Sequence, residues 1–190
     1  IEGKRLAALT RLAEAHPGDR LLEVGCGGGH VLEQFSQARR FGVDLSETML
    51  ARAGKRLRSN AVLLRASADA LPFRAGSFDI VLCTEVLEHV PDPAAVIREL
   101  LRVSAPGARI VVSIPNERNI DRAKRVLRRT PVLSRMLRTL AAEGNEWHLH
   151  QFDWPMLERQ VTGIARIRDR IAIPNRIMPV RYVASLEASR

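Results

Sequence analysis

The stretch Leu21-Leu22-Glu23-Val24-Gly25-Cys26-Gly27-Gly28-Gly29-His30 decides the fold of this chain. A short apolar run leads into this glycine-rich turn, and a second short run, Phe41-Gly42-Val43-Asp44, ends on a carboxylate. Glycine lacks a Cβ, so the turn can bend sharply and its backbone can approach a ligand closely. Asp44 ends the neighbouring strand, where its carboxylate can accept hydrogen bonds from ribose hydroxyls. This pattern is typical of one half of a nucleotide-binding α/β fold.

The spacing of the glycines distinguishes between classes of nucleotide. A dinucleotide fingerprint has glycine at its first, third and sixth positions, but the sixth position counted from Gly25 is His30. Glu23, two residues before the first glycine, is also foreign to that fingerprint, so a nicotinamide oxidoreductase does not fit. The motif Glu-Val-Gly-Cys-Gly-Gly-Gly resembles instead the first motif of the class I S-adenosylmethionine (SAM) methyltransferases. In that family the acid helps to fix the methionine end of SAM, and the loop packs against it.

Three later segments resemble further motifs of that family, in the family's order. Ser67–Phe73 precedes Ser77–Val90, and Leu101–Ser113 follows. The part from Phe78 to Asp92 is similar to the ubiquinone-biosynthesis O-methyltransferase branch. The resemblance covers about residues 20–115 and implies an enzyme that uses SAM and releases S-adenosylhomocysteine. It does not identify the methyl acceptor, which we expect to be a small molecule methylated on oxygen, with nitrogen and carbon as alternatives.

The alternation of strand and helix patterns predicts the architecture. Glu2–Ala15 has the apolar spacing of a helix, and later short apolar runs alternate with helical patterns, as in a parallel sheet covered on both faces. The resemblance implies a Rossmann-like seven-stranded α/β sheet of order 3-2-1-4-5-7-6, mostly parallel with an antiparallel last strand. We expect strands near residues 21–25, 41–44, 61–65, 78–84, 108–114, 164–173 and 180–186, and helices near 28–38, 46–58, 93–103, 119–140 (interrupted at Pro131) and 153–161.

Ligands of such folds bind beyond the carboxyl ends of the strands, and each motif ends at such a place. The resemblance implies that Asp69 accepts from the adenine amino group, with Ala70 beside it, and Leu45 is placed to pack on the adenine face. Asp44 has the alternative of capping the following helix, and Asp69 that of capping a turn. The predicted SAM-binding residues are Glu23, Gly25, Cys26, Gly27, Asp44, Leu45, Asp69, Ala70, Cys83 and Glu85.

Three histidines are candidates for a general base. The pair Glu88-His89 resembles a Glu-His pair that the branch places near the substrate, and a histidine there can take a hydroxyl proton. His148 and His150 lie on the same side of an extended segment, at a place where the family bears a histidine beside the substrate cleft. For all three, a structural role with local hydrogen bonds is the alternative. No metal site is predicted, because the segment has no recognised ligand spacing.

The net charge of +9 is unevenly distributed, and 27 of the 30 basic residues are Arg. The Arg excess is consistent with coding bias as well as function. Residues 118–138 contain eight basic residues and one acid, Asp121. This partly amphipathic segment suits a helix pair over the sheet edge or the active site, or contact with anionic lipid, a phosphorylated substrate or an acidic partner. Aromatic residues make up only 4% of the chain and form no stacking platform, which argues against nucleic acid.

The length of 190 residues suits one domain, here residues 1–190 with a basic helical insertion near 118–140. No apolar run reaches the ~18 residues that span a bilayer, and no signal peptide is visible, so we expect a cytoplasmic protein. Two cysteines give no disulfide framework. The chain opens at Ile1 without Met, so we expect further N-terminal residues. A catalytically silent SAM-fold partner protein is an alternative against which the intact motifs argue.

Overall fold

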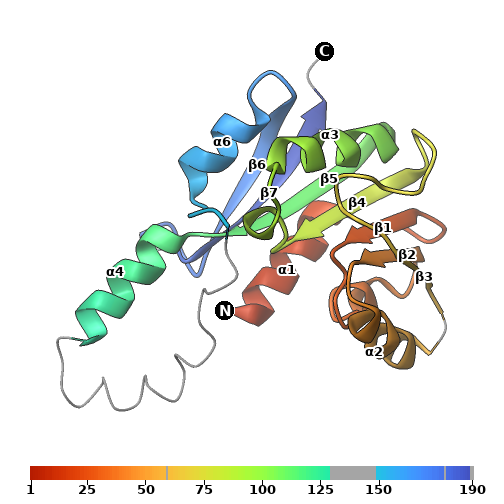
Figure 1. Cartoon of the computed structure of the whole chain (residues 1–190), viewed down its shortest axis with the longest axis horizontal. Helices are drawn as coiled ribbons and strands as arrows, with labels where there is room; N and C mark the ends of the chain where they lie inside the picture. The colour runs from red at the N-terminus through yellow and green to blue at the C-terminus, as the bar shows by residue number, and fades with distance from the viewer. Residues whose placement is uncertain (59, 129–148, 178, 189–190) are drawn as a thin grey trace.

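A seven-stranded sheet forms the centre of the computed structural model (Figure 1), which describes residues 1–58, 60–128, 149–177 and 179–188. The strand order is β3-β2-β1-β4-β5-β7-β6. Strand β7 runs antiparallel to β5 and β6, and the other neighbouring strands are parallel. The predicted fold class and strand order are therefore confirmed. The strands are β1 (Arg20–Val24), β2 (Arg39–Asp44), β3 (Val62–Arg65), β4 (Phe78–Thr84), β5 (Ser104–Pro115), β6 (Ala165–Ile173) and β7 (Arg181–Ala188).

Polar side chains begin three of the helices. In each, the N-cap carboxylate or hydroxyl accepts a hydrogen bond from the backbone N–H three residues later, which satisfies one of the free donors of the first turn. These caps are Ser46, Asp92 and Asp153. The helices are α1 (Glu2–Ala13), α2 (Glu47–Leu57), α3 (Pro93–Val103), α4 (Glu117–Arg128) and α6 (Trp154–Val161), with short 3-10 turns η1 (Leu32–Phe35) and η2 (Leu87–His89).

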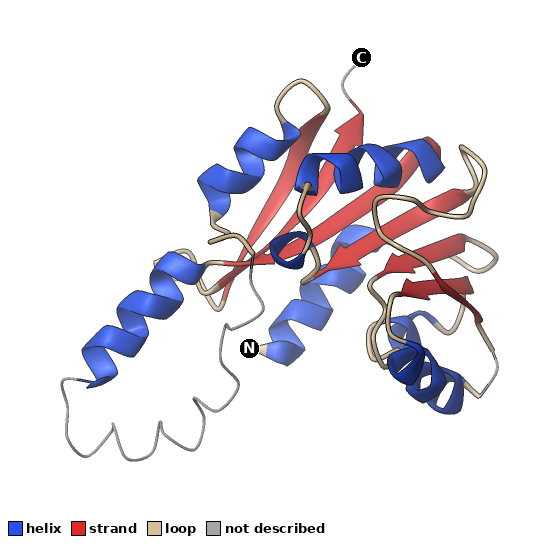
Figure 2. Ribbon diagram, viewed as in Figure 1, coloured by secondary structure: helices blue, strands red, loops and turns tan. Residues whose placement is uncertain are grey.

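Helices cover both faces of the sheet (Figure 2). On one face α3 and α6 pack against the strands through fully buried side chains such as Leu100 and Leu157. On the other face α1 and α2 do so, with Leu9 and Ala53 fully buried. Burying a leucine side chain contributes roughly 1.5–3 kcal/mol, so the apolar stripe of each helix holds it to the sheet. The sheet edge formed by the carboxyl ends of the parallel strands is left for ligands.

The predicted helix at 28–38 is wrong, because only the 3-10 turn η1 occupies this crossover. The glycine turn extends to Gly29 and β2 begins at Arg39, so few residues remain to return the chain to the start of the next strand. A helix rises only about 1.5 Å per residue, against about 3.3 Å for extended chain, and would need more residues than are available. Leu32 and Phe35 are nevertheless fully buried and contribute to the core.

The predicted helix at 119–140 corresponds in part to α4, which leaves the end of β5 and projects from the sheet edge (Figure 1). Residues 129–140 lie outside the described residues. None of the helices in the described part of the chain has the length and apolar character that crossing a membrane requires.

Candidate active site

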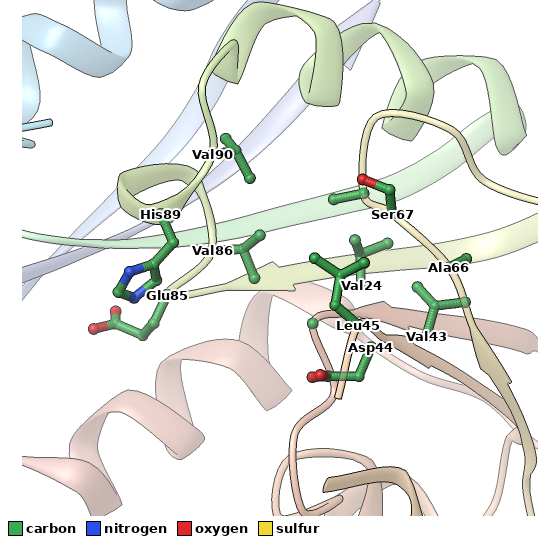
Figure 3. A pocket seen from close by; sticks show the side chains of 12 residues that line it. Val24, Val43, Asp44, Leu45, Ala66, Ser67, Glu85, Val86, His89 and Val90 are labelled. Atoms are coloured by element: carbon green, nitrogen blue, oxygen red, sulfur yellow. The ribbon is translucent and has the colours of Figure 1, made fainter. Parts of the chain in front are cut away.

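A cavity of about 260 Å³ opens at the carboxyl edge of the sheet (Figure 3). Gly25 follows β1, Asp44 ends β2 and Glu85 follows β4, so segments distant in sequence meet there. This is the position at which doubly wound sheets bind ligands. Most of its wall is apolar, with a few polar groups. The lining residues are Val24, Gly25, Val43, Asp44, Leu45, Ala66, Ser67, Ala68, Glu85, Val86, His89 and Val90.

The glycine turn has backbone conformations that other residues rarely adopt. Gly25 has a φ of +72°, and its N–H donates to the Val43 carbonyl at 2.8 Å. A Cβ on Gly25 would lie 2.2 Å from Cγ2 of Val86, well inside van der Waals contact. Both the conformation and the available space therefore require glycine at position 25. Gly27 has a φ of +48° but open space around a Cβ, so its backbone conformation alone favours glycine.

The Asp44 carboxylate is held by two backbone N–H groups. Its Oδ2 accepts from Gly27 and its Oδ1 from Ser46, each at 2.8 Å. Ser46 is the N-cap of α2, because its hydroxyl accepts from the Met49 N–H; Asp44 therefore does not cap this helix. Each carboxylate oxygen has two lone pairs, so Asp44 can still accept hydrogen bonds from a ligand in the cavity.

Three of the predicted residues are buried and do not line the cavity. Glu23 is 1% exposed, accepts a hydrogen bond from the Thr84 hydroxyl at 3.3 Å, and has no partner for Oε2 among the described atoms. Burial raises the pKa of Glu23 to about 8. Burial also raises the pKa of Cys26 to about 12 and shifts the pKa of Cys83 upward. Neither thiol is therefore a thiolate nucleophile near neutral pH.

The loop after β3 supplies a further wall of the cavity. Ala66, Ser67 and Ala68 line it, whereas Asp69 and Ala70 come immediately after them. The Ser67 hydroxyl donates to the Asp69 carboxylate, and the Ala70 N–H donates to the Ser67 carbonyl at 3.2 Å. These bonds close a turn, so a contact of Asp69 with adenine stays a prediction. Ser67 is a lining residue that we did not predict, although it stands inside the motif that contains Asp69.

Glu85 has an unusual backbone conformation at the end of β4. Its φ of +57° lies in the left-handed region, which non-glycine residues rarely occupy outside functional sites and turns. Both carboxylate oxygens are engaged: Oε1 accepts from the Ser113 hydroxyl at 2.7 Å, and Oε2 pairs with Arg181 at 3.4 Å. These contacts hold the Glu85 side chain at the cavity wall. The neighbouring strands β5 and β7 therefore stabilise a strained residue at the wall of the cavity.

Two of the three predicted histidines lie in the described part of the chain, and they have different surroundings. His89 is exposed and lines the cavity (Figure 3). His150 does not line it; its Nε2 lies 3.0 Å from the Val90 carbonyl and 3.3 Å from the Pro91 carbonyl. A protonated Nε2 donates to this backbone, which matches the structural alternative for His150. His148 lies outside the described residues.

Glu88 is a buried carboxyl group beside His89. It is 1% exposed, and its Oε2 has no hydrogen-bond partner among the described atoms. Burial, and then the charge of Glu85, raise the pKa of Glu88 to about 8. Its backbone carbonyl accepts from the Leu149 N–H at 2.9 Å. Through its backbone, Glu88 thus joins the His89 turn to the segment that contains His150. Its side chain is mostly a neutral acid at pH 7.

Arg5 of α1 is a charged residue near the site that we did not predict. It is 9% exposed and pairs with Glu2. Its guanidinium also interacts electrostatically with the carboxylates of Glu85 and Glu23. The sequence held one signal for Arg5. It lies four residues before Leu9, on the apolar face of the first helix. Within the described residues, no group of three His, Cys, Asp or Glu side chains could hold a metal ion.

Comparison with known proteins identifies the domain. Residues 22–112 match the family model described as a methyltransferase domain. The ubiquinone biosynthesis O-methyltransferases of Methylococcus capsulatus and Hahella chejuensis are 39% and 42% identical to this chain over 105 and 111 residues. These alignments cover 52% and 54% of this chain, but only 44% and 45% of the relatives. The chain thus spans about half the length of the curated relatives that it matches.

Solved structures share the fold. The N-methyltransferase NodS from Bradyrhizobium japonicum, in complex with S-adenosylhomocysteine, superposes with a TM-score of 0.73 at 17% identity, covering 100% of this chain and 88% of that one. The YcgJ protein from Bacillus subtilis superposes with a TM-score of 0.72 at 18% identity, covering 99% and 100%. At this identity the likeness concerns the fold alone. The sequence matches, independently of this likeness, show that residues 22–112 form a class I SAM-dependent methyltransferase domain, related to the ubiquinone-biosynthesis O-methyltransferase branch.

Proposed function

We propose that this chain transfers a methyl group from SAM to an oxygen atom of a small-molecule acceptor. The observation that carries the proposal is Asp44, a carboxylate fixed by two backbone N–H groups in a cavity beside a positive-φ glycine turn. A fixed acceptor pair at the end of β2 suits the two hydroxyls of a ribose. The names of the curated relatives support oxygen as the methylated atom.

The residues of the cavity fit this cofactor. Leu45 and Val90 give apolar surface for a purine, and Gly25 lines the cavity without adding side-chain bulk. Asp69, with Ala70 beside it, is proposed to accept from the adenine amino group, and Glu85 to border the methionine end. When bound, SAM supplies a methyl group on a positively charged sulfur, which is already a good leaving group.

The chain's own part in the reaction is alignment and proton removal. The rigid sheet edge can hold the acceptor oxygen in line with the methyl group, and such positioning alone lowers a barrier by several kcal/mol. We propose that a ring nitrogen of His89 takes the proton of the acceptor hydroxyl, because His89 is the described histidine that lines the cavity. His150 would position the turn that bears His89 through its contact with the Val90 carbonyl.

Calorimetric titration of SAM, S-adenosylhomocysteine and NAD tests the proposal. We expect the first two to bind and NAD not to bind. Asp44→Ala removes a charged acceptor, and hydrogen bonds to charged groups contribute ~1.5–3 kcal/mol, so SAM affinity should drop roughly ten- to a hundredfold. The exposed Glu187→Ala is a matched control for loss of one carboxylate. Unchanged SAM affinity in Asp44→Ala, or preference for NAD, would contradict the assignment, and SAM binding without turnover on any acceptor would indicate a silent partner protein.

We also propose that the basic segment 118–138 contacts anionic lipid. Arg122 and Arg125 are exposed on α4, which projects from the sheet edge (Figure 1), and residues 129–138 lie outside the described residues. Binding to acidic vesicles should weaken with salt, because charges are screened over ~8 Å at physiological ionic strength. Replacing Arg122, Arg125, Arg128 and Arg129 with Gln should abolish it and leave SAM affinity unchanged. A protein that ignores acidic vesicles at low salt would refute this proposal.

A further inference from the structure

A second cavity, of about 330 Å³, lies near the carboxyl edge of the sheet on strands β6 and β7. It shares no lining residue with the cavity that holds Asp44. Ala172 pairs with Tyr182 in the register, one position from the end where Ile173 and Pro115 both pair with Arg181. The second cavity therefore lies along the same sheet edge as the proposed cofactor site. Its lining residues are Arg170, Ala172, Arg176, Pro179 and Tyr182.

Among the described residues, the lining is cationic and contains no carboxylate. Arg170 is stacked on aromatic rings, with its Cζ 4.6 Å from the Trp154 ring centroid and 5.7 Å from that of Tyr182. This stacking orders the guanidinium plane and leaves its N–H edges available to a ligand. Arg176 has no hydrogen-bond or ion-pair partner among the described residues. The carboxylate of Glu158, beside this stack, already accepts from the Trp154 indole N–H at 2.5 Å.

The backbone acceptor in this lining is already satisfied. The Pro179 carbonyl accepts from the side-chain amides of Asn116 at 3.0 Å and Asn119 at 2.9 Å. A carbonyl oxygen has two lone pairs, so little negative potential from Pro179 is left to oppose an anion. The same bonds tie the β6–β7 turn to the start of α4. The cavity thus combines two guanidinium groups, a Tyr182 hydroxyl and a fixed backbone.

An ion pair at the end of β7 joins Glu85, which lines the proposed cofactor site, to Arg181, the chain neighbour of Tyr182. Arg181 immediately precedes Tyr182, and its guanidinium lies 3.4 Å from the Glu85 carboxylate. Glu85 in turn lines the cavity that contains His89. Because successive side chains of a strand point to opposite faces, a ligand that reaches from Tyr182 to Glu85 must lie across the end of β7. That is the edge at which an acceptor has to meet the methyl group.

We propose that the cavity of Arg170, Arg176 and Tyr182 binds an anionic oxygen group, a carboxylate or phosphate, carried by the methyl acceptor. Guanidinium groups match the geometry of these oxyanions and can bind them with paired hydrogen bonds. Held at this end, the acceptor would present its reacting hydroxyl toward Glu85 and His89. The inference rests on the proposed function, since it assigns the acceptor's anion to a site next to the methyl-transfer site.

Three small probes test the proposal on the whole chain with S-adenosylhomocysteine present: benzoate, phenyl phosphate and neutral benzyl alcohol. NMR titration should show that the two anions bind at least tenfold more tightly than the alcohol, and that added NaCl weakens their binding. Arg170→Gln and Arg176→Gln should each weaken anion binding about five- to tenfold, since each removes one charged donor group. Arg166→Gln, which removes the same charge from β6 outside the cavity, should change it less than twofold.

Any of three results would overturn the inference. The first is equal binding of the alcohol and the anions, and the second is anion binding that is unchanged in both glutamine variants. The third is inorganic phosphate binding as tightly as phenyl phosphate, which would indicate a site for free anions. Arg176 is exposed, so its variant keeps the experiment informative if Arg170→Gln loses its fold by circular dichroism. SAM affinity is measured separately: its absence refutes the proposed function, whereas its presence with no preference for anionic probes refutes only this inference.

Discussion

Replacing the buried Glu88 should change the free energy of unfolding in a direction that depends on pH. The group is 1% exposed, and burial raises its pKa from 4.5 to about 8. Above pH 4.5 the unfolded chain loses this proton while the folded chain keeps it. Stability that is fully present below the unfolded pKa is therefore lost as the pH rises toward the folded pKa. Each pH unit in that window costs about 1.4 kcal/mol.

Glu88→Gln replaces the acid with a neutral group of similar shape. Near pH 5 the folded wild-type carboxyl is protonated. The free energies of unfolding of the variant and the wild type should therefore differ by no more than about 1 kcal/mol. Between pH 5 and pH 8 the wild type should lose on the order of 3 kcal/mol more than the variant. At pH 8 the variant should therefore be the more stable protein. Glu23, whose pKa is also raised to about 8, should leave a residual pH dependence in the variant.

Urea unfolding followed by circular dichroism at pH 5, 6, 7 and 8 measures this difference. The exposed Glu187→Gln serves as the control for loss of one carboxyl group, and it should follow the wild-type pH dependence. If wild type and Glu88→Gln lose stability in parallel over this range, the Glu88 carboxyl ionises normally in the folded chain. The assignment of a neutral buried acid beside His89 would then be wrong.

The remaining predictions concern the glycine turn and the histidines. Gly25→Ala should abolish SAM binding in calorimetry while Gly27→Ala weakens it less, because only the former meets Val86 at 2.2 Å; equal affinities would contradict this packing. His89→Ala should lower kcat roughly 10²–10⁴-fold with unchanged SAM affinity, and full turnover with the natural acceptor would exclude a base at this position. His150→Ala should lower stability by about 1 kcal/mol in thermal melts through loss of its bond to the Val90 carbonyl; an unchanged melting temperature would show that this bond contributes nothing.

Local signals were sufficient for the framework of the fold. The apolar runs and their alternation with helical patterns predicted the sheet. Helix starts are marked by Ser46, Asp92 and Asp153, whose side chains accept hydrogen bonds from backbone N–H groups only three residues later. The one clear error, the helix at 28–38, arose because periodicity does not measure how far a crossover must travel. The strand order came from the family resemblance, and the structure confirmed it.

The sequence by itself determined the glycine turn and the carboxylate at Asp44, because both depend on residue type and on neighbours along the chain. Tertiary structure alone decided that Glu88 is buried and neutral, since its pKa depends on the elements packed around it. It also decided that His89 rather than His150 reaches the described cavity. Tertiary structure likewise decided that Arg170, Arg176 and Tyr182 line one cavity. Arg170 is on β6 and Arg176 follows that strand, and the antiparallel return of β7 places Tyr182 beside them.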